Sequence, residues 1–416
     1  MAELYENKTE AERAVLAAVD TGEYDCDLSV AELNELALTA GADVVGILTQ
    51  RRDRPNAGTY FGTGRLEELR EFCQNEQADV IIVDNELSPV QQRNIEDATG
   101  VRVIDRTTLI LDIFAQRANS NEGKLQVELA QLKYSLPRLS GRGKSMSRLG
   151  GGIGTRGPGE TKLETDKRHI RRRIHFLEQE LEELEKRRNL LRRRRLKDGV
   201  ETVVIVGYTN SGKSTLMNVL TNAGVLAEDK LFATLDPTSR ALQLPDGRKI
   251  MLIDTVGFIR RLPHHLVEAF KSTLEEAAGA NVIVNLCDAS DPDCSEHIQV
   301  TKQLLSDLGC DGTPVVEVFN KCDLLPHSEN VIRMPGSVCI SALTGEGLGE
   351  FLTAVSKALP PTRAGAKLII PYTDAKTASL FRKDAKIEKE EYREKGVYLE
   401  LTAEIALLEK YKNYIV

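Results

Sequence analysis

Residues 202–215 read TVVIVGYTNSGKST, an apolar run followed at once by a glycine-rich turn and then by residues with helical spacing. The turn has the form G-x-x-x-x-G-K-S from Gly207 to Ser214, in the strand–loop–helix setting that a phosphate-binding loop requires. Glycines let backbone N–H groups wrap around phosphates, and the N-terminus of the next helix adds its partial positive charge. We expect Lys213 to reach the β- and γ-phosphates and the Ser214 hydroxyl to bind Mg²⁺. The stretch predicts a P-loop domain with a mostly parallel sheet.

A second motif, D-x-x-G, follows the predicted strand IMLI and runs from Asp254 to Gly257. A carboxylate at a strand end beside the P-loop is suited to holding Mg²⁺ through water, and we expect that role for Asp254. We expect the Gly257 amide to contact the γ-phosphate. A D-x-x-G after a strand is as often a plain turn, so the motif gains meaning only from the others around it.

Two later motifs concern the base: N-K-C-D at 320–323, which ends the predicted strand PVVEVF, and S-A-L at 341–343, which follows SVCI. The Asp323 carboxylate is able to accept hydrogen bonds from N1–H and the exocyclic amino group of guanine, which adenine cannot supply. Such a site discriminates strongly, because the wrong base leaves buried polar groups unpaired. We expect the Lys321 stem to lie on the base and residues 341–343 to close the pocket.

The order of the four motifs resembles that of the translation-factor-like GTPases. Between the first two lies FATLDPT (232–238), which resembles switch I; the resemblance implies that the Thr234 hydroxyl closes onto Mg²⁺, with Thr238 as the competing candidate. The residues so placed around GTP or GDP are Gly207, Tyr208, Thr209, Asn210, Ser211, Gly212, Lys213, Ser214, Thr215, Phe232, Ala233, Thr234, Leu235, Asp236, Asp254, Thr255, Val256, Gly257, Asn320, Lys321, Cys322, Asp323, Ser341, Ala342 and Leu343. The implied catalytic residues are Lys213, Thr234 and Gly257, and the implied Mg²⁺ ligands are Ser214, Thr234 and Asp254.

Together with DTVGF and the upstream GGGIGTRGPGETKLETD (150–166), these motifs make nearly the whole chain similar to the HflX family of ribosome-associated GTPases. The resemblance implies an N-terminal domain, a helical linker, a G domain and binding to the large ribosomal subunit. It further implies splitting or rescue of idle or stalled ribosomes under stress.

Two positions predict features of the mechanism. Many regulatory GTPases have a Gln after D-x-x-G that orients the attacking water. Here the residue is Phe258, so we expect slow hydrolysis by the protein alone and a catalytic group supplied by the ribosome or another ligand. Asn210 lies where several similar GTPases hold K⁺ with an Asn carbonyl, which makes K⁺ a second candidate cation; a plain turn residue is the alternative.

Around this domain the chain is predicted to be multidomain α/β. A smaller α/β domain (1–137) with a helical end precedes a Gly/Arg-rich loop and basic helical linker (138–199), the GTP-binding domain (200–361) and a small α+β appendage (362–416). We expect the linker helix to form an antiparallel hairpin with the preceding helices through one narrow apolar seam, made of Ile170, Ile174, Leu177, Leu181, Leu184 and Leu191. In the first domain we expect a short helical lead-in to about residue 40, strands at 42–50, 78–85 and 101–106, and helices at 65–74 and 88–100.

The linker concentrates positive charge, with 19 Lys and Arg against 9 Asp and Glu between Arg138 and Asp198 in a chain of net charge −8. We favour a loop that folds against ribosomal RNA, with a flexible linker as the alternative. The phosphate contacts would come from Arg138, Arg142, Lys144, Arg148 and Arg156. The match of residues 152–157 to G-x-G-x-x-G lacks a preceding strand, so a dinucleotide site is disfavoured.

The composition is that of a globular protein, with 416 residues, 41% hydrophobic and 28% charged. The seven cysteines are scattered, which is typical of reduced thiols, and we find no secretory signal and no apolar run long enough to span a membrane. We therefore expect a cytoplasmic protein, and a monomer. An RNA-binding assembly factor with GTP as a structural ligand remains the alternative function. For ATP binding by the first domain we find no P-loop, only Gly62-Thr63-Gly64.

Overall fold

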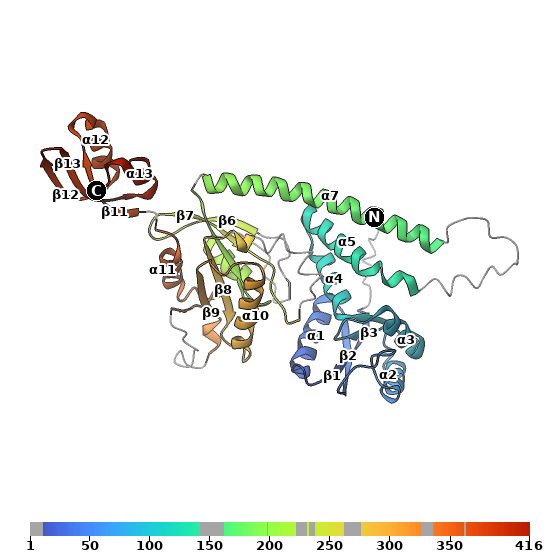
Figure 1. The fold of residues 1–416 in the computed structure, drawn as a ribbon. Coiled ribbons are helices and arrows are strands. Elements are labelled where there is room, and N and C mark those ends of the chain that lie inside the picture. The colour runs from blue at the N-terminus through green and yellow to red at the C-terminus, as the bar shows by residue number, and fades with distance from the viewer. Residues whose placement is uncertain are drawn as a thin grey trace, which may run out of the picture. The chain divides into compact units, whose positions relative to one another are not determined.

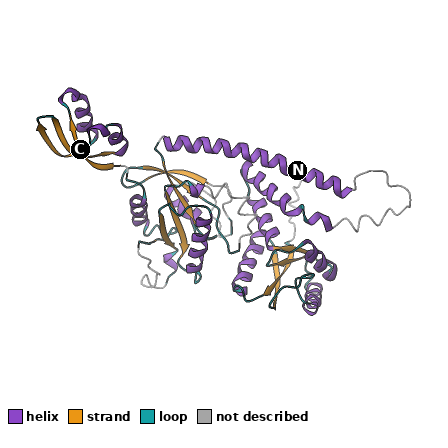
Figure 2. Cartoon of the chain, in the orientation of Figure 1, coloured by secondary structure: helices purple, strands orange, loops and turns teal. Residues whose placement is uncertain are grey.

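The computed structural model describes most of the chain, in two compact units, Met1–Thr353 and Ala354–Val416 (Figure 1). The described residues are 11–141, 162–197, 199–221, 231–232, 238–261, 276–325, 336–361 and 363–416. Helices alternate with strands through the first unit (Figure 2), as the sequence predicts for a multidomain α/β protein. The finer division at 137, 199 and 361 stays a prediction.

The N-terminal part of the first unit is a four-stranded sheet in the order β2-β1-β3-β4, with every pair parallel. Its elements are β1 (Arg13–Asp20), α1 (Cys26–Ala40), β2 (Asp43–Arg51), α2 (Thr63–Asn75), β3 (Val80–Val83), α3 (Pro89–Thr99), β4 (Arg102–Asp105) and α4 (Arg106–Arg117). The strands and helices predicted after residue 40 are confirmed, with bounds shifted by one or two residues.

The predicted helical lead-in is wrong for its first half. Residues Arg13–Asp20 form β1, which pairs with both β2 and β3 and is buried along its whole middle. A strand covered on both faces reads as an unbroken apolar run, and AVLAAV cannot be told from a buried helix by periodicity. The second half of the lead-in, Cys26–Ala40, is helical as expected; Asp25 caps its N-terminus and Gly41, with φ 91°, its C-terminus.

Two helices leave this sheet and form the predicted hairpin. They are α5 (Asn121–Ser135) and α7 (Lys162–Lys197), and the short 3₁₀ helix η1 (Arg138–Gly141) lies between them in the chain. Ion pairs join Lys133 to Glu178 at 2.7 Å and Glu122 to Arg188 at 2.7 Å, which is an antiparallel register. Leu177 is fully buried, whereas Leu191 is 56% exposed, so the apolar seam predicted to reach Leu191 ends earlier.

The G domain is built on a six-stranded sheet in the order β10-β9-β8-β5-β7-β6. Its elements are β5 (Glu201–Val206), α8 (Lys213–Thr221), β6 (Thr238–Gln243), β7 (Lys249–Asp254), β8 (Val282–Asp288), α10 (Cys294–Asp307), β9 (Val315–Asn320), η3 (Cys322–Leu324), β10 (Val338–Cys339) and α11 (Leu348–Ala358). Only the β6–β7 hairpin is antiparallel. The predicted mostly parallel sheet is confirmed, and the motif residues fall at the carboxyl ends of its parallel strands.

The second unit is a small α+β fold, as the sequence predicts. An antiparallel sheet in the order β11-β13-β12 carries its own core around Leu368, Phe381 and Leu399. Its elements are β11 (Arg363–Ile370), η5 (Tyr372–Asp374), α12 (Ala375–Asp384), β12 (Lys386–Arg393), β13 (Gly396–Glu404), α13 (Ile405–Lys410) and η6 (Lys412–Tyr414). Across the described ranges of the chain, no helix is both long and apolar enough to cross a membrane.

Candidate functional site

The P-loop has two positions where only glycine fits. Gly207 has φ 150°, and a Cβ there would collide with the carbonyl oxygen of Leu286 on the neighbouring strand. Gly212 has φ 92°, and a Cβ there would collide with the Asn320 side-chain amide. Because L-residues rarely adopt such φ values, both the conformation and the space require glycine. The loop therefore lies tight against β8 and the start of the N-K-C-D motif.

Lys213 is buried at the base of this loop. Its Nζ donates to the carbonyl oxygens of Gly207 at 3.1 Å and Tyr208 at 2.7 Å. Burial lowers the pKa of Lys213 from 10.5 to about 8, although the nearby Asp254 carboxylate opposes the shift. A desolvated ammonium held by two neutral carbonyls is stabilised by an anion that enters the loop, so the environment suits a phosphate.

Two of the three predicted Mg²⁺ ligands, Ser214 and Asp254, lie side by side, and the third, Thr234, is outside the described residues. The Ser214 hydroxyl, at the start of α8, donates to the Asp254 carboxylate, at the end of β7, over 2.9 Å. A hydroxyl and a carboxylate are hard oxygen ligands that fit Mg²⁺, which typically takes one or two protein ligands and completes its shell with phosphate oxygens and water. The described parts of the chain hold no group of three or more His, Cys, Asp or Glu side chains placed to bind a metal ion.

The D-x-x-G segment lies directly on the P-loop. The Phe258 N–H donates to the Gly207 carbonyl at 3.1 Å, and the Phe258 carbonyl accepts from the Thr209 N–H at 2.8 Å. A Cβ on Gly257 would be 2.8 Å from the Thr209 methyl group, so this close approach also requires glycine. The Phe258 ring is 2% exposed in the core, where it cannot orient a water molecule.

On the base side, Asn320 joins two of the predicted motifs. Its side-chain amide donates to the Ser211 carbonyl at 2.8 Å, and its side-chain oxygen accepts from the Ala342 N–H at 2.8 Å. The structure thus brings P-loop, N-K-C-D and S-A-L together at one edge of the sheet. Asp323 and Leu343 are exposed at this edge, and Lys321 has a left-handed backbone with φ 62°.

Part of the predicted switch I falls outside the described residues, namely Ala233, Thr234, Leu235 and Asp236. Phe232 is described: it is buried and packs edge-on against Phe114 of α4, with ring centroids 4.7 Å apart. The competing candidate Thr238 is the first residue of β6 and pairs with Asp254 in the β6–β7 ladder.

The sequence analysis missed a buried polar cluster that joins the P-loop to the N-terminal part. The Tyr208 hydroxyl donates to the Glu32 carboxylate of α1 at 2.6 Å and accepts from the Arg260 N–H at 2.6 Å. The Tyr208 ring also stacks on His297 of α10 at 3.7 Å. Burial, and then the adjacent Glu32, raise the pKa of Tyr208, so its hydroxyl remains a neutral donor.

The same cluster continues to the carboxyl end of β3. Arg106 donates to Asp84 at 2.8 Å and to Glu32 at 2.7 Å, and it also reaches the Arg260 carbonyl at 3.2 Å. Arg261, with φ 54°, donates to Asp84 at 3.1 Å. Burial alone would lower the pKa of Arg106, but its two carboxylate partners raise it. We refer to Glu32, Asp84, Arg106, Arg260 and Arg261 as the coupling cluster.

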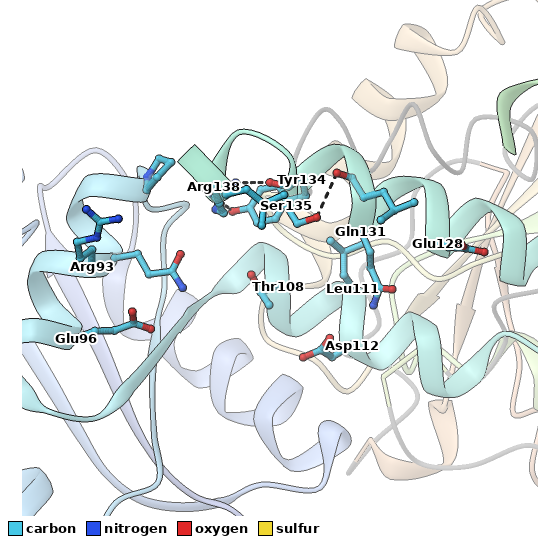
Figure 3. A pocket seen from close by; sticks show the side chains of 14 residues that line it. Arg93, Glu96, Thr108, Leu111, Asp112, Glu128, Gln131, Tyr134, Ser135 and Arg138 are labelled. Atoms are coloured by element: carbon cyan, nitrogen blue, oxygen red, sulfur yellow. Dashed lines mark hydrogen bonds between the residues drawn. The ribbon is translucent and has the colours of Figure 1, made fainter. Parts of the chain in front are cut away.

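The predicted RNA contacts fall almost entirely outside the described residues, namely Arg142, Lys144, Arg148 and Arg156. Arg138 is described, and its guanidinium is occupied within the chain: it donates to the Leu87 carbonyl at 2.8 Å and Asp105 at 3.2 Å, and lies over the Tyr134 ring. Arg138 and Tyr134 line a pocket of about 400 Å³ beside α3 and α4 (Figure 3). Arg138 therefore anchors η1, and its contact with RNA stays a prediction.

Fold and site together define a P-loop GTPase: a glycine-built phosphate loop with a buried lysine, a D-x-x-G segment resting on it and an N-K-C-D motif tied to both. Three family profiles match the chain, described as GTP-binding GTPase N-terminal (27–115), GTP-binding GTPase Middle Region (117–195) and 50S ribosome-binding GTPase (202–321). The chain belongs to the HflX family and is a GTP hydrolase.

Two relatives match over almost their whole length. The GTPase HflX of Caldanaerobacter subterraneus is 52% identical over 97% of this chain and 94% of its own, and that of Lacrimispora saccharolytica is 50% identical over 96% and 95%. A crystal structure of a GTP-binding protein from Sulfolobus solfataricus in complex with GDP is 27% identical, with a TM-score of 0.44 over 83% of this chain and 98% of that one.

Proposed function

We propose that this GTPase binds the large ribosomal subunit in the cytoplasm and uses GTP binding and hydrolysis to control that association. The finer proposal is that it splits or rescues idle or stalled ribosomes under stress. The family profile over residues 202–321, described as 50S ribosome-binding GTPase, supports the partner. The positive charge between Arg138 and Asp198 supports contact with RNA.

In this proposal the motif residues hold the nucleotide at the carboxyl edge of the G-domain sheet. Lys213 moves its ammonium from the loop carbonyls to the β- and γ-phosphates, and Asp323 reads the guanine edge. Ser214 and Asp254, with Thr234, hold Mg²⁺, which neutralises phosphate charge when bound. The exposed Asn210, with φ 61°, is the candidate ligand for K⁺, and equal GTP turnover in Na⁺ and K⁺ would remove that ion from the proposal.

Hydrolysis by the protein alone is proposed to be slow. Phe258 replaces the water-orienting Gln, and its ring is buried while its main chain bonds to Gly207 and Thr209. The group that orients the water then comes from the bound ribosome. Turnover that is already fast without ribosomes, and unchanged by them, would contradict this part of the proposal.

The coupling cluster is the observation that carries the proposal. Arg260 and Arg261 lie three and four residues after Gly257, the predicted γ-phosphate sensor, and both are bonded to the N-terminal part through Glu32, Asp84 and Arg106. A shift of Gly257 toward a γ-phosphate would displace Arg260 and Arg261. Because both arginines are bonded to the N-terminal part, the N-terminal sheet and its helical hairpin would move with them. In this proposal the segment after D-x-x-G and the N-terminal sheet contact each other differently in the GTP and GDP states, and that difference transmits the nucleotide state.

Co-sedimentation with the large subunit tests the proposal. We expect binding at least about tenfold tighter with a non-hydrolysable GTP analogue than with GDP, and steeply weaker binding as salt rises, because phosphate contacts release counterions. Equal binding with both nucleotides would favour the RNA-binding assembly factor in which GTP is structural. Sedimentation of whole ribosomes with the GTP-bound protein tests splitting separately: free subunits support it, and intact ribosomes contradict it.

A further inference from the structure

We infer that Asp288 is a positioning residue for guanine-nucleotide binding: it holds the ammonium of Lys321 so that the lysine stem lies as a fixed platform for the base. Asp288 belongs to none of the four motifs. The inference rests on the proposed role of Lys321 within the nucleotide site, and it adds to that site a residue supplied by a neighbouring strand.

The sheet register brings the two residues together. Asp288 is the last residue of β8 and pairs with Asn320, the last residue of β9, and Lys321 follows directly. The Ala289 N–H donates to the Asn320 carbonyl at 2.8 Å, which fixes the loop after β8 against the motif. From these strand ends the Lys321 Nζ reaches the Asp288 carboxylate at 2.7 Å.

Asp288 is itself held in place. One carboxylate oxygen accepts from the Ser290 N–H at 2.9 Å and from the Ser290 hydroxyl at 2.6 Å, while the other accepts from Lys321. The Asp288 and Lys321 side chains are 16% and 26% exposed, so the pair is partly shielded from water. We therefore expect this ion pair to hold its side chains more firmly than an ordinary surface ion pair does. In a surface pair, the entropy lost in ordering two long side chains offsets most of the attraction.

The lysine needs such support for two reasons. A free lysine side chain has several rotatable bonds, and ordering it on a base costs conformational entropy at the moment of binding. The Lys321 backbone is also in the left-handed region, with φ 62°, which a residue with a Cβ adopts at a cost and which persists where the surroundings impose it. Asp288 pre-orders the side chain before the nucleotide arrives.

The platform is indifferent to the 2-amino group of guanine, because a lysine stem contacts the face of the purine and not its edge. Loss of Asp288 should therefore weaken the binding of GDP and the binding of IDP, which lacks the 2-amino group, by the same factor. Loss of Asp323, which reads the edge, should reduce the preference for GDP over IDP. Affinities for GDP and IDP thus distinguish the role of Asp288 from that of Asp323.

The test is a double-mutant cycle read by displacement of a fluorescent GDP analogue. Asp288→Asn keeps the oxygen that accepts from Ser290 and removes the charge, and we expect its Kd for GDP to rise about fivefold, equally for IDP. In a Lys321→Met background the same substitution should change Kd by less than about 1.5-fold. The control Asp311→Asn removes an equal charge from the exposed turn that precedes β9 and should leave Kd unchanged.

Three outcomes overturn the inference: an Asp288→Asn protein that binds GDP like wild type, a GDP-to-IDP ratio that changes with Asp288, or an effect of Asp288→Asn that persists with Met at 321. The last would assign Asp288 to general stability, which thermal unfolding without nucleotide checks. If wild-type protein shows no preference for GDP over ADP, the proposed nucleotide site fails instead, and the two failures are distinguished.

Discussion

The first unit contains two parallel sheets whose carboxyl edges have different chemistry. At the G-domain edge lie glycines with positive φ, and one buried lysine donates to two carbonyls of the loop itself. At the N-terminal edge, the ends of β3 and β4 carry Asp84 and Arg106, which are already paired with each other. Ligands of open α/β sheets bind at carboxyl edges.

The difference shows what each edge is built to receive. At the N-terminal edge, the charged side chains of Asp84 and Arg106 bond to Arg261 and to the Arg260 carbonyl of the G domain. One edge is therefore suited to a nucleotide, and the other holds the polypeptide segment that follows D-x-x-G. In our proposal the same architecture binds the nucleotide in one sheet and responds to the nucleotide state in the other.

The largest expected effect comes from breaking the N-terminal edge. Arg106→Met leaves the Asp84 and Glu32 carboxylates, which are shielded from water, without their main cation. We expect the free energy of unfolding of the first unit, measured in urea, to fall by about 3–5 kcal/mol. Arg102→Met is the matched control, since its ion pair with Glu12 is more than half exposed on both sides and should contribute at most about 1 kcal/mol. Equal losses for both variants would mean that the buried cluster has no special weight.

At the G-domain edge, Lys213→Ala should reduce GTP turnover at least about 100-fold, because it removes the charge that the loop presents to the phosphates. Phosphate release and GDP displacement would measure the loss. Lys302→Ala, which removes an ammonium from the surface of α10, should be silent in both assays. A Lys213→Ala protein with near-normal turnover would show that the loop is not the reaction site.

The depressed pKa of Lys213 predicts a pH dependence. The folded protein without nucleotide loses this proton near pH 8, whereas the unfolded chain keeps it to about 10.5, so stability rises with pH across that window. GDP binds the charged form, so its affinity should fall up to about tenfold per pH unit above 8. Lys213→Arg stays charged and should bind GDP without that fall; a flat wild-type profile from pH 7 to 9.5 would refute the assignment.

A smaller effect is expected for the link between the edges. Tyr208→Phe removes the hydroxyl that bonds to Glu32 and to the Arg260 N–H, and should cost about 1–3 kcal/mol of stability because both partners are shielded from water. Tyr24→Phe loses a long, 3.4 Å bond to the Val19 carbonyl while its ring stays beneath the Arg261 guanidinium, and it serves as the control. If the two variants unfold at the same midpoint, the Tyr208 hydroxyl does not contribute to stability.

The sequence predicted the G domain well because its signals are local. Each motif follows an apolar strand directly, and glycine marks the positions where φ or space excludes other residues, as at Gly207 and Gly212. The parallel sheets followed from the alternation of strands and helices. The first strand was missed because an alanine-rich run buried on both faces has no period to read.

The coupling cluster could not be predicted in the same way. Its hydrogen bonds join residues separated by as many as 228 positions, such as Glu32 and Arg260, and such contacts leave no spacing pattern in one sequence. Asp84 and Arg106 did offer a signal in the sequence, because charged residues that directly follow buried strands indicate a polar site at the carboxyl edge of the sheet. Arg138 is the converse case: its place beside a Gly/Arg-rich loop predicts contact with RNA, and nothing in that pattern indicates the bonds that its guanidinium makes to Asp105 and the Leu87 carbonyl in the folded chain.

The most direct test of the account compares large-subunit affinity in the GTP-analogue and GDP states for wild type and Arg261→Gln. Arg261 is partly exposed, so the substitution removes its bond to Asp84 with little damage to the fold, and Arg240→Gln, at an exposed arginine of β6, is the control. We predict that the ratio of the two affinities is at least about 10 for wild type and control and falls toward 1 for Arg261→Gln. A ratio that Arg261→Gln leaves unchanged would contradict transmission of the nucleotide state through this cluster.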